Sequence, residues 1–520
     1  MIHTMDRAAS LYPTDMRSRL TLLASLLSLA LALSGCMFGP NYRRPEIETM
    51  EKYRFGEKVA RDIADTAWWE QFGDPVLNEM IRIALVENKD IRIATARIEE
   101  FQGRYGVTRS ELFPQIGGDA AAERRRSTAF IWPRGLVGDI DPYYSYYQVA
   151  INANWELDIW GRIRRLSEAA RHQLFASEAA RRATILTLVS SVASSYINLL
   201  ILDRQLEIAR ATAATRKDTL DVFRMRYEGG VISQLELAQI ESQYETAVAA
   251  IPALESSIAQ QENALAVLLG RNPGPIARGR ELAKLELPMV SAGLPSELLM
   301  RRPDLREAEQ NLISANAQIG AARALYFPRI SLTGVLGVAS TQLVTLFTGP
   351  AYMAAFGAMT AIPIFTAGGI AGQVKQAEAR QEQALVGYQR AIQIAFREVE
   401  DSLIAVQKTR AELAAQTRRV EALRTYLELA QLRYDEGYIS FIEVLDAQRS
   451  LFEAETTQAQ TQGRVFNSLV NLYKSLGGGW VVEADRIRGQ MEAGSQENTP
   501  APPDGNLMNT ADHERTKAEP

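Results

Sequence analysis

The chain has 520 residues, and its 57 Lys and Arg nearly balance its 62 Asp and Glu, which leaves a net charge of -5. Without a basic excess to neutralise phosphates, nucleic acid is not an expected partner. Apolar residues make up 47% of the chain, which excludes global disorder. Three His and one Cys leave little material for a zinc site or a Ser-His-Asp triad, and no G-x-x-x-x-G-K-[ST] loop is present. We therefore expect no catalytic site, no metal site and no bound nucleotide.

The N-terminus carries the features of an export signal. Two arginines precede an apolar run over 20–33, which is too short for a spanning helix and is typical of a secretory signal peptide. The run ends in Leu-Ser-Gly-Cys, which resembles a bacterial lipobox and makes Cys36 the expected lipidated first residue of the mature chain. The alternative is an ordinary signal peptide, but lipidation explains the single thiol of an exported chain. Apart from this covalent lipid, no cofactor is expected. Met37 follows the Cys, and by resemblance to sorted lipoproteins a residue other than Asp favours the outer membrane.

Parts of the sequence occur twice. The segment 226–236 matches 433–443, and the Phe-Pro pair at 113–114 matches the pair at 327–328, so the body is predicted to be two copies of one unit. The composition and the turn residues between the copies set the remaining boundaries. We expect a signal peptide at 1–35, a lipidated extended segment at 36–74, a first repeat at 75–270, a linker at 271–294, a second repeat at 295–477 and a polar, disordered tail at 478–520.

Each repeat is predicted to contain the same elements in the same order. A helix of about 35 residues leads to the Phe-Pro pair, two alternating segments follow, and a very long helix then turns tightly into a second helix. The long helices are expected over 160–226 and 369–434, with Ala- and Ser-rich seams that favour coiled-coil packing. The stretch 185–202 is uncharged, but its apolar residues at spacings of three and four predict a helix packed on other helices rather than a membrane span.

The alternating segments have the pattern of membrane strands. In the segment that starts at Tyr143, apolar residues face one way and polar residues the other over about eleven residues, 147–157, a length that suits a tilted strand in a bilayer. The second copy repeats the pattern more weakly over 330–338, with a partner strand at about 352–364. The alternative is an ordinary half-buried hairpin. Four strands cannot close a barrel and open edges are not tolerated in lipid, so the chain is expected to oligomerise. Two copies supply eight strands and three supply twelve; twelve leave room for a pore, which favours a trimer.

Four stretches resemble the outer membrane factor family, the TolC-like exit ducts of efflux pumps, and its NodT-type lipoprotein branch. They lie at 68–75, 157–162, 302–328 and 437–448. The resemblance implies a mainly α fold with transmembrane β: a trimeric α-helical barrel joined to a twelve-stranded outer-membrane β-barrel, with four strands per chain. It also implies a passive, gated duct in the outer membrane of a Gram-negative bacterium, without an active site, that carries small molecules from an inner-membrane pump and a periplasmic adaptor.

Three other functions remain open at this point. A periplasmic adaptor lipoprotein also combines an anchor with a helical hairpin, but adaptors have one hairpin and two are predicted here. A purely structural coiled-coil lipoprotein would not have the alternating segments. Within the duct assignment, export of metal ions or type I export of proteins remains possible, because a duct need not recognise what passes through it.

Both hairpin turns have the sequence Gly-x-Ile-Ser-x-x-Glu. Gly is expected to end each long helix, because it enters the left-handed region freely. The Ser-x-x-Glu that follows predicts a capping box in each turn, Ser233 with Glu236 in the first and Ser440 with Glu443 in the second.

The resemblance also implies a gate at these turns. By position, the family's gate residues fall on Tyr434, Glu236, Glu443 and Asp446, whereas its gate arginine falls on Ile439. Capping accounts for both Glu residues, so Asp446 is the strongest gate candidate, and a solvated helix face is the alternative. Three such carboxylates around an axis would repel one another and attract a cation. The tip residues are candidate adaptor contacts, or else they pack within the trimer; they are Gly230, Val231, Ile232, Ser233, Gly437, Tyr438, Ile439 and Ser440.

Overall fold

The computed structural model describes residues 37–46, 53–55, 67–126, 143–288, 298–299 and 301–477. The expected signal peptide, Cys36 and the expected tail at 478–520 lie outside the described residues. The first half of the chain contains η1 (Trp68–Phe72), α2 (Pro75–Glu87), α3 (Lys89–Ser110), β1 (Gln115–Arg126), β2 (Tyr143–Leu157), α4 (Arg162–Glu228) and α5 (Gln234–Leu268). The second half contains η2 (Leu282–Lys284), α7 (Pro303–Ala324), β3 (Arg329–Ser340), η3 (Leu343–Thr345), η4 (Gly349–Ala351), β4 (Tyr352–Ala361), α8 (Gly369–Asp435) and α9 (Phe441–Ser475).

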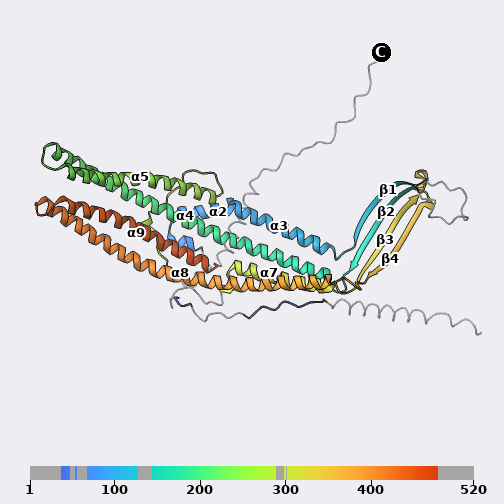
Figure 1. The fold of residues 1–520 in the computed structure, drawn as a ribbon. Helices are drawn as coiled ribbons and strands as arrows, with labels where there is room; N and C mark the ends of the chain where they lie inside the picture. The colour runs from blue at the N-terminus through green and yellow to red at the C-terminus, as the bar shows by residue number, and fades with distance from the viewer. Residues whose placement is uncertain are drawn as a thin grey trace, which may run out of the picture.

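The two halves repeat one order of elements, in which a helix is followed by two strands, a very long helix and a shorter helix (Figure 1). The equivalent helices have equal lengths. α3 and α7 have 22 residues each, α4 and α8 have 67 each, and α5 and α9 have 35 each. These equalities confirm the internal repeat and both long helices.

The first helix of each repeat is shorter than expected. α3 and α7 have 22 residues, and in the first repeat Asn88 separates α3 from α2. The Oδ1 atom of Asn88 accepts a hydrogen bond from the backbone N–H of Asp90 at 2.8 Å, and its amide donates to the Leu268 carbonyl at 2.9 Å. A buried Asn that caps one helix and bonds to another competes with a continuous helix, so the chain bends here.

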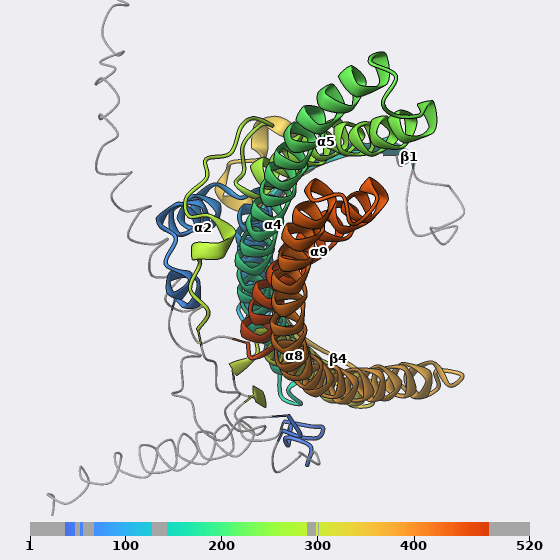
Figure 2. The same cartoon turned by 90° about the vertical axis from the view of Figure 1, so that its left-hand side faces the viewer.

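The helices form one elongated layer that is curved. Viewed from the end, α5, α4, α9 and α8 lie along an arc with an open concave side (Figure 2). α4 pairs with α5 and α8 pairs with α9, and both hairpins turn at the end of the layer that lies away from the strands (Figure 1). α7 packs on α4 and α8, and α3 packs on α4. One chain therefore has the shape of a segment of a tube wall.

The middle of α4 is buried among the other helices. The apolar residues at spacings of three and four are at most 1% exposed; they are Ile185, Val189, Val192, Tyr196 and Leu199. They belong to a core cluster with α2, η1 and the end of α9. Among the described helices, α4 alone has the length and composition to cross a membrane, but most of its apolar window lies inside the protein. This confirms the expected packing of 185–202.

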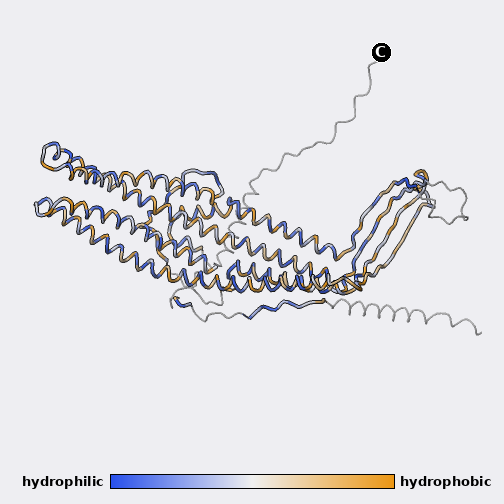
Figure 3. Tube along the Cα trace, in the orientation of Figure 1, coloured by the Kyte–Doolittle hydropathy of each residue, from blue (hydrophilic) through white to orange (hydrophobic). Residues whose placement is uncertain are grey.

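The four strands form one antiparallel sheet in the order β1-β2-β3-β4. Val149 lies opposite Ala120 on one side and Val338 on the other, and Ile151 lies opposite Leu336. Directly opposite residues share a face of the sheet, so these residues form one apolar face. Hydrophobic and hydrophilic residues are interspersed along the sheet (Figure 3), which agrees with the expected alternation.

The opposite, polar face of the sheet carries hydrogen-bonded and charged side chains. Asp119 accepts hydrogen bonds from the amides of Gln148, at 3.3 Å, and Asn152. Arg125 forms an ion pair with Glu123 at 2.5 Å. One apolar face and one polar face suit a sheet that separates hydrocarbon from water.

A buried carboxylate joins the start of the first repeat to the connection between the repeats. Asp74 is fully buried and caps α2, with Oδ1 accepting from the N–H of Val76 at 2.8 Å. Oδ2 accepts from the Tyr196 hydroxyl at 2.8 Å and from the N–H of Arg280 at 2.9 Å. Burial, together with the neighbouring carboxylate, raises the pKa of Tyr196, so its hydroxyl stays protonated and donates. This network ties α2, α4 and the connecting segment together.

Replacing Tyr196 by Phe should lower the stability of the protein by about 1–3 kcal/mol, because the fully buried Asp74 carboxylate loses the Tyr196 hydroxyl, which donates to it at 2.8 Å. Thermal unfolding of the detergent-solubilised protein measures the change. Tyr326, which is 52% exposed, supplies the control variant Tyr326→Phe. Equal melting temperatures for the two variants would contradict the structural role of this network.

Candidate functional site at the helical tips

The two hairpin turns have the same backbone. Gly230 and Gly437 have φ values of 73° and 79°, in the left-handed region, which confirms the expected helix ends. After each Gly, a backbone N–H returns to the long helix: Val231 donates to the Arg226 carbonyl at 2.8 Å, and Tyr438 donates to the Arg433 carbonyl at 2.9 Å. Such six-to-one bonds satisfy carbonyls that the end of a helix leaves unpaired.

The capping box is present in one turn and absent from the other. In the first, the N–H of Glu236 donates to the Ser233 hydroxyl at 3.2 Å, and the Glu236 carboxylate accepts from the N–H of Ser233 at 2.9 Å. In the second, Ser440 has the same backbone angles but makes no side-chain cap, so the box expected between Ser440 and Glu443 is wrong. Phe441 stands where the first turn has the polar Gln234, and its burial anchors the start of α9 instead.

An aromatic cluster lies just behind the turns. The Phe441 ring is 4.3 Å from the Phe223 ring and 4.9 Å from the Tyr434 ring, measured between centroids. Ile232 and Ile439 pack against this cluster, so these two candidate adaptor contacts are partly buried. Val231 and Tyr438 are each 75% exposed and remain the apolar side chains that the turns present to their surroundings.

Tyr434 contacts a cation from the other repeat. The Nη1 atom of Arg226 donates to the Tyr434 hydroxyl at 2.7 Å, and the same guanidinium lies over the Phe223 ring at 5.3 Å. The family's gate arginine falls on Ile439, and the cation beside Tyr434 is instead Arg226, which was not predicted. The repeat held a signal, because Arg226 and Arg433 are equivalent positions and each precedes a Tyr.

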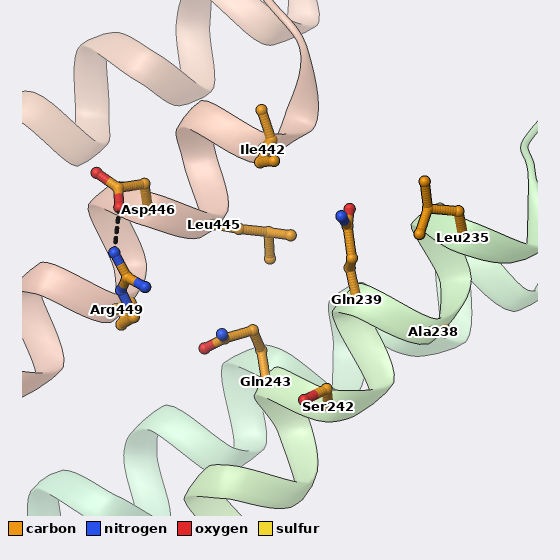
Figure 4. A pocket seen from close by; sticks show the side chains of 9 residues that line it. All are labelled: Leu235, Ala238, Gln239, Ser242, Gln243, Ile442, Leu445, Asp446 and Arg449. Carbon is orange, nitrogen blue, oxygen red and sulfur yellow. Dashed lines mark hydrogen bonds and ion pairs between the residues drawn. The ribbon is translucent and has the colours of Figure 1, made fainter.

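Asp446 also has a cation partner, within its own helix. Its Oδ1 accepts from Arg449 Nη2 at 2.6 Å, and the two side chains are 50% and 56% exposed. Within one chain, the Asp446 carboxylate therefore already has a cation beside it. Asp446 and Arg449 line a groove between α5 and α9, opposite the amides of Gln239 and Gln243 (Figure 4).

The four gate candidates therefore do not form one cluster, and each has its own surroundings. Asp446 pairs with Arg449, Tyr434 bonds to Arg226, and the Glu236 carboxylate is used for capping. Glu443 is exposed in the first turn of α9. In the part of the chain that the structure describes, no group of three or more His, Cys, Asp or Glu could hold a metal ion.

The sequence matches the family model described as outer membrane efflux protein over residues 80–271 and 294–478. These two segments make up most of the chain. The chain belongs to the outer membrane efflux protein family. Membership excludes the adaptor and the purely structural coiled-coil alternatives.

Relatives and solved structures agree with this assignment. The chain is 37% identical to the solvent efflux pump outer membrane protein SrpC of Pseudomonas putida over 460 residues, which cover 87% of this chain and 97% of that protein. It is 35% identical to the cation efflux system protein CusC of Escherichia coli O6:H1 over 457 residues, 87% of this chain and 97% of that protein. The open-state structure of the Neisseria gonorrhoeae MtrE outer membrane channel superposes with a TM-score of 0.77 at 34% identity, covering 86% of this chain and 99% of that one.

The protein is therefore an outer membrane efflux channel. Its fold joins a helical wall to a β domain that lies in the outer membrane, and both parts are built from the two internal repeats. Transport, rather than chemical conversion, is the function of the family.

Proposed function

We propose that three copies of this chain form the passive outer-membrane duct of a tripartite efflux system, which moves small organic molecules received from an inner-membrane pump and a periplasmic adaptor. One observation carries the proposal: within the described residues, the sheet of one chain ends in two unpaired edges, β1 and β4. Lipid offers no partner to an unpaired backbone group, so copies of the chain must pair these edges. Three copies supply twelve strands, and the curved helical layers then continue one another around the same axis.

Organic molecules are the favoured cargo because relatives at 35–37% identity are described as solvent, toluene and antibiotic efflux proteins. A second candidate cargo is a metal cation, which the 35% identity with CusC supports. Energy for either cargo comes from the pump, and the chain itself performs no chemical step.

Deleting the chain from its host should lower the tolerated concentrations of toluene and of apolar antibiotics, while tolerance of metal salts stays unchanged. Growth inhibition measures both, and complementation with the intact gene is the control. If only metal tolerance falls, the cargo is metal cations and not organic molecules. Cross-linking of the purified protein to a species other than a trimer would contradict the duct itself.

The position of the N-terminal segment supports lipidation at Cys36. Phe38 packs on Phe327, with ring centroids 4.2 Å apart, and on Trp160 at 6.0 Å. Both partners lie at junctions between strands and helices, so the chain enters the described structure at the boundary of the β domain. Buried Arg165 holds the segment there by donating to the carbonyls of Phe38 and Gly39 and to Asn41. A lipid on the residue before Met37 would therefore start close to the membrane.

The variant Cys36→Ser should abolish incorporation of labelled palmitate, because the hydroxyl does not replace the thiol as the acyl acceptor. Membrane fractions of cells fed the labelled lipid give the measurement, and Ser34→Ala, two residues upstream, is the matched control. Full labelling of the Cys36→Ser variant would show that Cys36 is not the attachment site.

The tips are the proposed site of gating and of adaptor contact. The Arg226–Tyr434 bond links the two hairpins of one chain, and Asp446 lies in the groove between α5 and α9. The Arg226–Tyr434 bond stabilises one arrangement of the two hairpins, and a gate opens when the hairpins move apart. The exposed Val231 and Tyr438 are the apolar groups offered to an adaptor.

Tyr434→Phe should raise the open-to-closed ratio of the channel about fivefold, which corresponds to the loss of about 1 kcal/mol of hydrogen bonding between the hairpins in the closed state. Conductance in planar bilayers is the measurement. The matched control is Tyr438→Phe, whose side chain is exposed. A Tyr434→Phe variant that conducts like this control would limit Tyr434 to a local structural role.

A further inference from the structure

Three successive arginines, Arg124, Arg125 and Arg126, end the strand β1. This end of the sheet lies away from the helices (Figure 1). It therefore lies on the side of the membrane opposite to the helical wall, at the cell surface. All three side chains are exposed.

The arginines are divided between the two faces of the sheet. Arg124 lies opposite Ser145 and Arg126 lies opposite Tyr143 in the pairing of β1 with β2. Because side chains alternate along a strand, Arg124, Arg126 and Tyr143 share the apolar face that carries Ala120 and Val149. Arg125 lies on the polar face, where it pairs with Glu123 at 2.5 Å.

The two arginines of the apolar face are arranged around one aromatic ring. The Cζ atoms of Arg124 and Arg126 lie 5.9 Å and 5.7 Å from the centroid of the Tyr143 ring. Contact with an aromatic face orients a guanidinium and leaves its N–H groups free to bond elsewhere. Within the described ranges, neither side chain forms an ion pair with a carboxylate.

The height of this pair matches the outer margin of the hydrocarbon layer. The ten residue-to-residue steps from Ile116 to Arg126 advance about 25 Å along the membrane normal, at about 3.3 Å per residue and a tilt of about 40°. The apolar band of an outer-membrane barrel is about 25 Å tall, with aromatic residues at its rims. Tyr143, which lies opposite Arg126, is at that rim on the same face. The two guanidinium groups thus lie at the level of the lipid headgroups, on the lipid side of the sheet.

We propose that Arg124 and Arg126 form a binding site for the phosphate groups of outer-leaflet lipid headgroups. A guanidinium donates two parallel hydrogen bonds to a phosphate, and basic clusters at a membrane surface attract anionic headgroups. Tyr143 positions both cations, and the apolar face below them contacts the acyl chains. The site depends on the β domain lying in the outer membrane and not on the cargo, the pump or the gate.

The test uses the full-length protein in detergent, and native mass spectrometry counts bound lipid. The probes are diphosphorylated lipid A, dephosphorylated lipid A and inorganic phosphate. The double variant Arg124→Gln/Arg126→Gln should bind diphosphorylated lipid A at least about tenfold more weakly. Each basic residue near a membrane surface strengthens binding to anionic headgroups, and the variant loses two of them. The matched control Arg125→Gln removes the neighbouring arginine from the other face and should bind as the original protein does.

Other results would overturn the proposal. An equal loss in Arg125→Gln would assign the effect to overall charge, and equal binding of the two forms of lipid A would remove the phosphate from recognition. Displacement of the lipid by inorganic phosphate at similar concentration would show that the site binds free phosphate rather than lipid. If the double Gln variant does not assemble, Arg124→Lys/Arg126→Lys, which keeps the charge, takes its place. The proposal is then decided by whether the original protein prefers diphosphorylated to dephosphorylated lipid A.

Discussion

The architecture depends on one constraint: a backbone N–H or C=O group in lipid must be hydrogen-bonded within protein. The sheet of one chain satisfies this for β2 and β3, which have neighbours on both sides, and leaves β1 and β4 each with one row of unpaired groups. Apolar side chains make the outer face of the sheet compatible with lipid, but they do not satisfy these edges. The need for further copies therefore follows from hydrogen bonding, and the curvature of the helical layer determines that the copies surround a common space.

The internal repeat extends this constraint into the helices. Each repeat contributes two strands and one long hairpin, and the equal lengths of α4 and α8 bring both hairpins to the same level. The buried network of Asp74, Tyr196 and the N–H of Arg280 connects the repeats at the middle of the molecule. Because a buried polar group without a partner is costly, this network holds the middle of the wall in one arrangement. The tips, which are mostly exposed, are less constrained and are suited to movement.

The two faces of the sheet and the two ends of the molecule perform different tasks. The polar face holds Asp119 with its amide partners and the Glu123–Arg125 pair, whereas the apolar face carries aromatic and cationic side chains at its outer rim. At the opposite end, a cation from one repeat meets a tyrosine from the other. Cations thus lie beside aromatic rings at both ends: Arg124 and Arg126 over Tyr143 at the membrane end, and Arg226 over Phe223 at the tips.

The sequence by itself determined the repeat, the long helices, the alternating strands and the glycines of both turns. These features depend on residues close together in the chain, since periodicity and turn chemistry are local. It did not determine the break at Asn88, the missing cap at Ser440, or the inward packing of Ile232 and Ile439. Only the tertiary structure paired Arg226 with Tyr434, which are 208 residues apart, because their contact requires two hairpins to lie side by side. Contacts across such distances depend on packing and register, which no short stretch of sequence contains.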